Sequence, residues 1–198
     1  MGLRDDVLSL LACEDDAVRG RFNELVSRHG HGMSRERASG ESATGTDRAD
    51  RGSLPALADR DRRLIDRVRL VDTAPVGVTL CGPAYRDTPI LYANRTFRDL
   101  TGYPLDELRG RNPRLLQGPR TEPEAVATLR EAVSIWEPVT VEVWNHRRDG
   151  TPFLNRVSLR PLRGKDGTIT HWAAVQAAVG ETADRAGRAE RYRRGSAL

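Results

Sequence analysis

The sequence predicts an α+β fold in which a five-stranded antiparallel sheet packs against helices. Two short β-rich runs lie within residues 76–93, and three longer ones lie between residues 139 and 179. Tight-turn residues separate the three later runs, and helical patterns fill the interval between the two groups. Because hairpin turns join antiparallel neighbours, whereas parallel strands need long crossovers, these observations favour an antiparallel sheet.

The composition limits the size and the class of the protein. With 198 residues, 38% hydrophobic and 30% charged, the chain can build one domain with flanking segments. The net charge of +4 is dispersed, so nucleic-acid binding is not indicated. No stretch approaches the roughly 20 apolar residues of a membrane span, and no apolar signal-peptide core begins the chain. We therefore expect a cytoplasmic protein without membrane contact.

The expected order along the chain begins with helical segments. Residues 1–29 form an amphipathic helical segment of one or two helices, 30–53 a Gly- and Ser-rich flexible linker, 54–72 a flanking helix, 73–180 the core domain, and 181–198 a polar basic tail. The helical pattern of the flanking segment is clearest over residues 56–71. The two cysteines, Cys13 and Cys81, fit no metal-ligand spacing, so we expect free thiols and no metal site.

The first half of the core combines two strands with short helices. A strand at 76–81 and a second at 90–93 should form the opening hairpin. Asn94 is suited to cap a short helix that Gly102 ends. Asn112 can cap a further helical turn with Pro113 at its first position, where the missing N–H is tolerated.

The second half begins with the longest helix of the core. Thr121 and Glu124 form an expected capping box for a helix that runs to about Ile135. Three strands follow at 139–147, 152–163 and 168–179, joined by turns at residues 149–150 and 164–167. They form an antiparallel meander.

Strand alternation groups three amide side chains. Residues two apart share a face, which gives the sets Val139, Val141, Val143 and Asn145; Asn155, Val157 and Leu159; and Trp172, Ala174 and Gln176. Each face is apolar with one amide. A carboxamide both donates and accepts, so three converging amides could pair with the alternating carbonyl and N–H edge of a heterocycle such as the flavin pyrimidine ring. For any single amide, a surface or locally bonded side chain is the alternative interpretation.

A motif at residues 110–119 reads Gly-Arg-Asn-Pro-Arg-Leu-Leu-Gln-Gly-Pro. It resembles the signature of LOV domains, the flavin-binding blue-light branch of the PAS family, and the resemblance covers about residues 70–180. It implies a PAS fold whose sheet and helices enclose a flavin. Pro113 stands where the family normally has its photoreactive cysteine. Proline has no nucleophile and no backbone N–H, so a cysteinyl–flavin bond at this position is excluded.

The resemblance also implies roles for individual residues. It places Asn112 and Gln117 on the ribityl chain of the flavin, Arg114 and Arg130 on the terminal phosphate, Asn145 and Asn155 on the pyrimidine edge, and Gln176 near flavin N5, with Thr79, Leu159 and Trp172 at the pocket wall. Guanidinium groups suit phosphate, which favours FMN, with FAD or riboflavin as alternatives. For Trp172 the alternative is simple core packing. Cys81 lies in a different element from Pro113 and would need unusual geometry to reach the flavin.

The leading hypothesis is a LOV-like sensory protein that is not an enzyme. It would sense blue light or redox state by flavin photoreduction to the neutral semiquinone, and would signal through a hydrogen-bond change at Gln176. We expect a homodimer through the flanking helices and the outer face of the sheet, with residues 56–71 and Trp144 as the first surface, and a separate effector protein as a further partner. The alternative is a flavin-free PAS module for dimerisation or protein interaction.

Overall fold

Five antiparallel strands form one sheet in the order β2-β1-β5-β4-β3. The computed structural model describes residues 2–30, 57–164 and 166–180. The strands are β1 (Gly77–Cys81), β2 (Ile90–Ala93), β3 (Val139–His146), β4 (Pro152–Arg163) and β5 (Ile169–Ala178). The predicted α+β class and antiparallel sheet are therefore confirmed. The expected linker beyond Gly30 and the basic tail lie outside the described residues.

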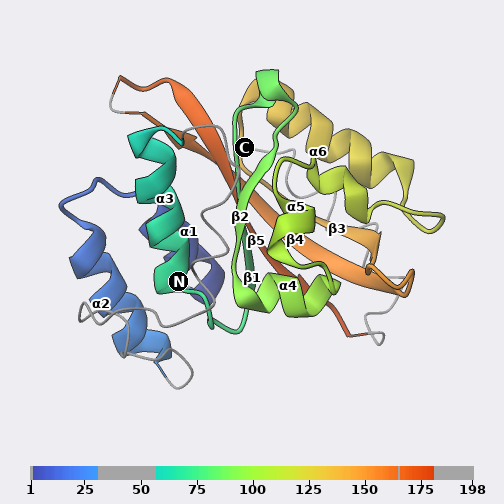
Figure 1. Cartoon of the computed structure of the whole chain (residues 1–198), viewed down its shortest axis with the longest axis horizontal. Helices are drawn as coiled ribbons and strands as arrows, with labels where there is room; N and C mark the ends of the chain where they lie inside the picture. The colour runs from blue at the N-terminus through green and yellow to red at the C-terminus, as the bar shows by residue number, and fades with distance from the viewer. Residues whose placement is uncertain (1, 31–56, 165, 181–198) are drawn as a thin grey trace, which may run out of the picture.

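Helices cover both faces of the sheet (Figure 1). They are α1 (Leu3–Ala12), α2 (Val18–His29), α3 (Asp59–Leu70), α4 (Arg95–Thr101), α5 (Leu105–Leu108) and α6 (Pro123–Ile135), with the short turns η3 (Ala84–Arg86) and η4 (Pro113–Leu116). The three N-terminal helices lie on one side of the sheet, whereas α4, α5 and α6 lie on the other. We call these sides the outer and the inner face.

Exposure along the strands follows their position in the sheet. The edge strand β3 alternates between buried and partly exposed residues, as expected for a strand with one face towards a core. The more central strand β1 is buried at every position, and β5 is buried over most of its length. The alternation of buried and partly exposed residues is therefore clear in β3, whereas β4 and β5 are buried at consecutive positions because both of their faces are covered.

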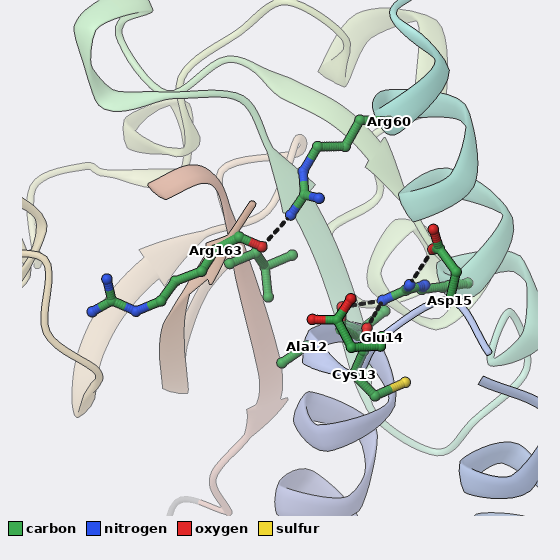
Figure 2. Close-up of a pocket in the computed structure, with 9 residues that line it drawn as sticks. Ala12, Cys13, Glu14, Asp15, Arg60 and Arg163 are labelled. Atoms are coloured by element: carbon green, nitrogen blue, oxygen red, sulfur yellow. Dashed lines mark hydrogen bonds and ion pairs between the residues drawn. The ribbon is translucent and has the colours of Figure 1, made fainter. Parts of the chain in front are cut away.

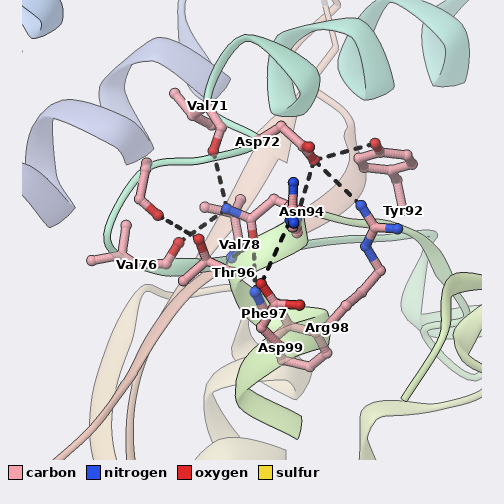
Figure 3. Close-up of polar contacts among 12 residues, drawn as sticks. Val71, Asp72, Val76, Val78, Tyr92, Asn94, Thr96, Phe97, Arg98 and Asp99 are labelled. Carbon is pink, nitrogen blue, oxygen red and sulfur yellow. Dashed lines mark hydrogen bonds and ion pairs between the residues drawn. The ribbon is translucent and has the colours of Figure 1, made fainter. Parts of the chain in front are cut away.

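Asn94 joins α4 to the sheet through four hydrogen bonds (Figure 3). Its Oδ1 accepts from the backbone N–H of Val78 at 2.7 Å and of Phe97 at 3.0 Å. Its Nδ2 donates to the carbonyls of Val71 and Val76, both at 3.0 Å. Asn94 is fully buried, so this side chain caps α4 as predicted and also fixes the segment that connects α3 to β1.

The predicted capping box of α6 is wrong. The helix begins at Pro123 and its N-cap is Glu122. The hydroxyl of Thr121 instead donates to the carbonyl of Trp144 at 2.6 Å and accepts from the backbone N–H of Gly118. A tertiary contact with strand β3 therefore takes the group that the local pattern assigned to the helix end.

The N-terminal helix α1 packs on the outer face of β4 and β5. Its side chains Val7, Leu10 and Leu11 are almost completely buried and join the main core. The sequence alone leaves open whether this segment docks on the sheet, pairs between subunits or captures a partner. In this structure the segment covers the chain's own sheet.

A buried arginine connects α1 to α3. Nη1 of Arg67 donates to the carbonyls of Leu11 at 2.9 Å and Cys13 at 2.6 Å, and its Nη2 donates to Asp15 at 2.6 Å. A cation at this point complements the negative end of the α1 dipole. Figure 2 shows this junction, with Cys13 and Asp15 near the end of α1 and Arg60 reaching towards the carbonyl of Arg163.

A second polar contact joins α3 to β5. His171 is buried, and its Nε2 lies 2.8 Å from Oδ1 of Asp61. Burial lowers the pKa of His171, while the Asp61 carboxylate acts in the opposite direction. Arg60 also donates to the hydroxyl of Thr170 at 2.8 Å. The predicted dimer surface on residues 56–71 is thus largely used within the chain, because Leu64, Ile65 and Val68 of α3 are buried in the core.

Replacement of Arg67 by alanine should lower the free energy of unfolding by about 3 kcal/mol, because it leaves the carbonyls of Leu11 and Cys13 without their donor and removes a buried cation that also pairs with Asp15. Urea denaturation followed by circular dichroism measures this loss. The matched control is Arg62→Ala on the same helix, whose guanidinium is exposed and pairs with Asp59 at 3.3 Å. That change should cost less than about 0.5 kcal/mol. Equal losses in the two variants would contradict the role of Arg67.

Candidate functional site

A row of hydrogen-bonded amides crosses the inner face of the sheet. Nδ2 of Asn155 donates to Oδ1 of Asn145 at 2.9 Å and to Oε1 of Gln176 at 2.7 Å. Nε2 of Gln176 in turn donates to Oγ1 of Thr79 at 3.1 Å. The antiparallel registers explain the convergence, since Asn155 lies opposite Val143 and Gln176 lies opposite both Val157 and Gly77. We call these four side chains, the amides of Asn145, Asn155 and Gln176 with the hydroxyl of Thr79, the amide row.

One acceptor in the amide row is left open. Oδ1 of Asn155 is buried and has no hydrogen-bond partner among the described residues. The side chain is fully buried, so an unmade bond there costs about 1–3 kcal/mol. Buried acceptors without a hydrogen bond are rare in folded proteins. A ligand that donates an N–H to this oxygen would explain why Asn155 is left with one.

An apolar cluster adjoins the amide row. It consists of Ala125, Val141, Val143, Val157 and Ala174, with Leu129, Val139 and Leu159 packed against them. These residues come from α6 and from strands β3, β4 and β5. Aliphatic side chains beside a few fixed polar groups are the usual lining of a site for a flat heterocycle. Trp172 lies instead in the main core, where it is only 2% exposed.

The residues expected at the ribityl chain and phosphate lie near a loop between η3 and β2. Nδ2 of Asn112 lies 2.6 Å from the carbonyl of Asp87 and 2.8 Å from the hydroxyl of Thr88. Arg114 forms an ion pair with the Asp87 carboxylate. The structure therefore brings Asn112 and Arg114 together through Asp87, a residue that the sequence motif does not indicate as part of the site.

Two other predicted residues make no part of that arrangement. Gln117 and Arg130 are exposed to solvent. Gln117 ends η4, and Arg130 lies on α6. Their expected contacts with a ribityl chain and a phosphate stay predictions.

Pro113 fits its position without strain. It is the first residue of η4, after the N-cap Asn112, whose Oδ1 accepts from the backbone N–H of Arg114 at 2.9 Å. The first helical position needs no N–H donor, so proline is tolerated there. The turn therefore forms with proline at this position, and the expected absence of thiol chemistry here stays a prediction about the photochemistry.

Burial and position both disfavour Cys81 as a substitute nucleophile. It is buried in β1, opposite Ile90 and Trp172, and burial raises the pKa of its thiol to about 12. The thiolate is the reactive form, so burial lowers the reactivity of this thiol. Cys13 is partly exposed, with its pKa raised mainly by burial.

Thiol titration with a disulfide-exchange reagent should therefore separate the two cysteines. In the native protein Cys13 should react within the assay, and Cys81 only after denaturant is added. Cys13→Ser should abolish the native phase, whereas Cys81→Ser should leave it unchanged. Rapid native labelling of Cys81 would show that the thiol is accessible and would contradict its burial.

Trp144 is covered by a residue of its own chain. The guanidinium carbon of Arg120 lies 3.7 Å from the centre of the Trp144 ring. The backbone N–H of Trp144 donates to Glu122 at 3.2 Å, and its carbonyl accepts from Thr121. The expected interface position is thus used to fasten the segment before α6 to the edge strand β3.

Comparison with known proteins agrees with this fold. A family model described as "PAS domain" matches residues 75–177. The chain therefore belongs to the PAS domain family. Within that family it carries a LOV (light-oxygen-voltage) domain, a sensory module, as its similarity to solved structures shows. The dark structure of the blue-light photoreceptor Aureochrome1 LOV is 34% identical with a TM-score of 0.57, over 71% of this chain and 99% of that one. A structure titled "Flavin Analogue Sheds Light on Light-Oxygen-Voltage Domain Mechanism" is 36% identical with a TM-score of 0.60, over 65% and 96%.

Longer relatives share the same region. Blue-light-activated histidine kinase 1 of Erythrobacter litoralis is 37% identical over 146 residues, which are 71% of this chain and 40% of the kinase. The bacterioopsin transcriptional activator of Halobacterium salinarum is 38% identical over 123 residues, 62% of this chain and 18% of the activator. The chain thus spans less than half of the length of these relatives. No helix among the described residues is long and apolar enough to cross a membrane.

Proposed function

We propose that this protein binds a flavin noncovalently on the inner face of its sheet and senses blue light or redox state without a cysteinyl–flavin bond. The open acceptor of Asn155, buried beside an apolar cluster, is the observation that supports this proposal most strongly. Asn145, Asn155 and Gln176 would face the edge of the flavin ring, with Thr79 and Leu159 at the wall. We assign the protein a sensory rather than a catalytic role, in the cytoplasm.

A bound flavin would absorb blue light and accept an electron from a tryptophan, a tyrosine or an external reductant. The chain's own contribution is a switchable hydrogen bond at Gln176. In the structure, Oε1 of Gln176 accepts from Asn155 and its Nε2 donates to Thr79. Rotation of the amide would exchange the two atoms, while Thr79 could then donate in place of accepting.

Rotation of Gln176 cannot occur alone in the amide row. It would bring Nε2 against Nδ2 of Asn155, so two donors would meet. If Asn155 also rotates, its open Oδ1 accepts from Gln176, and Asn145 must then rotate to present its own Nδ2. An amide that does not rotate with the other two leaves a buried hydrogen bond unmade, at a cost of about 1–3 kcal/mol. The three amides therefore favour two arrangements, one with none rotated and one with all three rotated.

The outer face gives this switch an output. Gln176 lies on β5, and the neighbouring residues of that strand face the side on which α1 packs. A change in β5 would alter the docking of α1 on β4 and β5, which the Arg67 contacts hold. Release of α1 would free the sheet for a second copy of the chain or for a separate effector protein. The homodimer predicted through the flanking helices and the sheet is therefore proposed to need this release.

Arg114 and Arg130 favour FMN as the flavin, because paired guanidinium groups suit a terminal phosphate. Mass spectrometry of the ligand released by denaturation would separate FMN from FAD and riboflavin. A colourless protein that takes up no flavin after expression in a flavin-replete host would contradict the proposal and would favour a flavin-free interaction module.

Restoration of a thiol at position 113 should restore adduct chemistry. In the flavin-loaded Pro113→Cys variant, blue light should bleach the visible flavin absorbance reversibly, with recovery in the dark, because the thiol stands where LOV domains carry their photoreactive cysteine. The first turn of η4 tolerates this change, since its N–H groups are not bonded within the helix.

Pro113→Ser is the matched control, because it replaces proline by a side chain similar in size to cysteine that lacks the thiol. Neither this variant nor the parent protein should form a thiol adduct. Any change in flavin absorbance that they show should come from photoreduction and should increase when a reductant is added. If the flavin-loaded Pro113→Cys variant also failed to form an adduct, as expected of Pro113→Ser, then the proposal that the pocket lacks only the reactive thiol would be wrong.

A further inference from the structure

Asp87 occupies the polar groups that the proposed site would offer to a phosphorylated ligand. Its carboxylate forms an ion pair with Arg114, and its Oδ1 also lies 3.2 Å from Nδ2 of Asn112. Asn112 donates to the Asp87 carbonyl and to the Thr88 hydroxyl as well. An amide has two hydrogens, so its donors are shared among these three acceptors.

The loop is held in this place against its backbone preference. Asp87 and Thr88 both have positive φ angles, 66° and 45°. Aspartate tolerates this left-handed region, but a β-branched threonine rarely adopts it. The contacts with Asn112 and Arg114 stabilise the conformation, which keeps the Asp87 carboxylate beside the guanidinium.

The two ends of the proposed site therefore differ in whether their polar groups are already occupied. In the amide row, a buried acceptor is open for a ring. At Arg114, an anionic side chain already neutralises the cation, and both partners are more than half exposed, at 57% and 68%. A phosphate that approached Arg114 would have to displace the carboxylate or accept its repulsion.

We propose that Asp87 is a specificity-determining residue that competes with the ligand phosphate for Arg114 and so reduces the preference of the site for FMN over riboflavin. The inference rests on the proposed flavin site. The negative charge of the carboxylate acts on the phosphate end, because riboflavin carries the same ring and ribityl chain without the phosphate. The contacts of Asp87 with Asn112, the residue expected at the ribityl chain, bear on both flavins alike. Removal of the Asp87 charge should then strengthen FMN binding and leave riboflavin binding unchanged.

The test measures the affinities of the flavin-free protein for FMN and for riboflavin by fluorescence quenching. In Asp87→Asn the FMN affinity should rise about fivefold, the factor that corresponds to about 1 kcal/mol for an exposed ion pair. The riboflavin affinity should stay within about twofold of the parent. Asp87→Gly should give the same shift in the ratio, since glycine accepts the positive φ of this position without strain.

Asp99→Asn is the matched control, because Asp99 is similarly exposed and pairs with Arg95 at 3.7 Å on α4. It should change neither affinity. An unchanged or reduced ratio of FMN to riboflavin affinity in both Asp87 variants would overturn this inference and leave the flavin site intact. Absence of binding of either flavin to the parent protein would overturn the flavin site itself, and the inference with it.

Discussion

The hydrogen bonds of Asn155 are the interaction on which the functional arrangement depends. This one side chain, fully buried in β4, donates to Asn145 on β3 and to Gln176 on β5, so it ties three strands together on the inner face. Both of its hydrogens are used, whereas its oxygen is not. A side chain chosen for stability alone would not leave a buried acceptor open at this place, because the unmade bond costs free energy. The amide row is better explained as a surface prepared for a ligand edge.

The outer face of the sheet is covered by helix packing and closed by a buried arginine. There the apolar side of α1 covers β4 and β5, and Arg67 closes the end of that helix. Under the proposed function, the inner face would bind the ligand and the outer face would transmit the signal, because β5 belongs to both. The docking of α1 on the outer face is the contact that the proposed signal would change. The apolar side of α3 is buried in the core and Trp144 is covered by Arg120, so both positions expected at a dimer surface are engaged within the chain.

Much of the fold could be predicted from the sequence because its signals are local. The strand alternation of β3, the capping role of Asn94 and the glycine that ends α4 all follow from patterns of two to four residues. The convergence of Asn145, Asn155 and Gln176 also follows from alternation once the meander is assumed. The start of α6 could not be predicted, because a strand distant in sequence takes the hydroxyl of Thr121. The Asp87 contact was missed for a related reason: it depends on a loop with positive φ angles that approaches Arg114 only in the folded chain.

The flavin affinity of Asn155→Leu, compared with that of the parent protein, tests the central claim most directly. Leucine is close to asparagine in size and removes the amide from the row. The account predicts a folded protein that binds flavin at least about tenfold more weakly, since a ring edge loses its hydrogen-bond partners. Flavin binding as tight as that of the parent would contradict the claim that the amide row is the ligand surface.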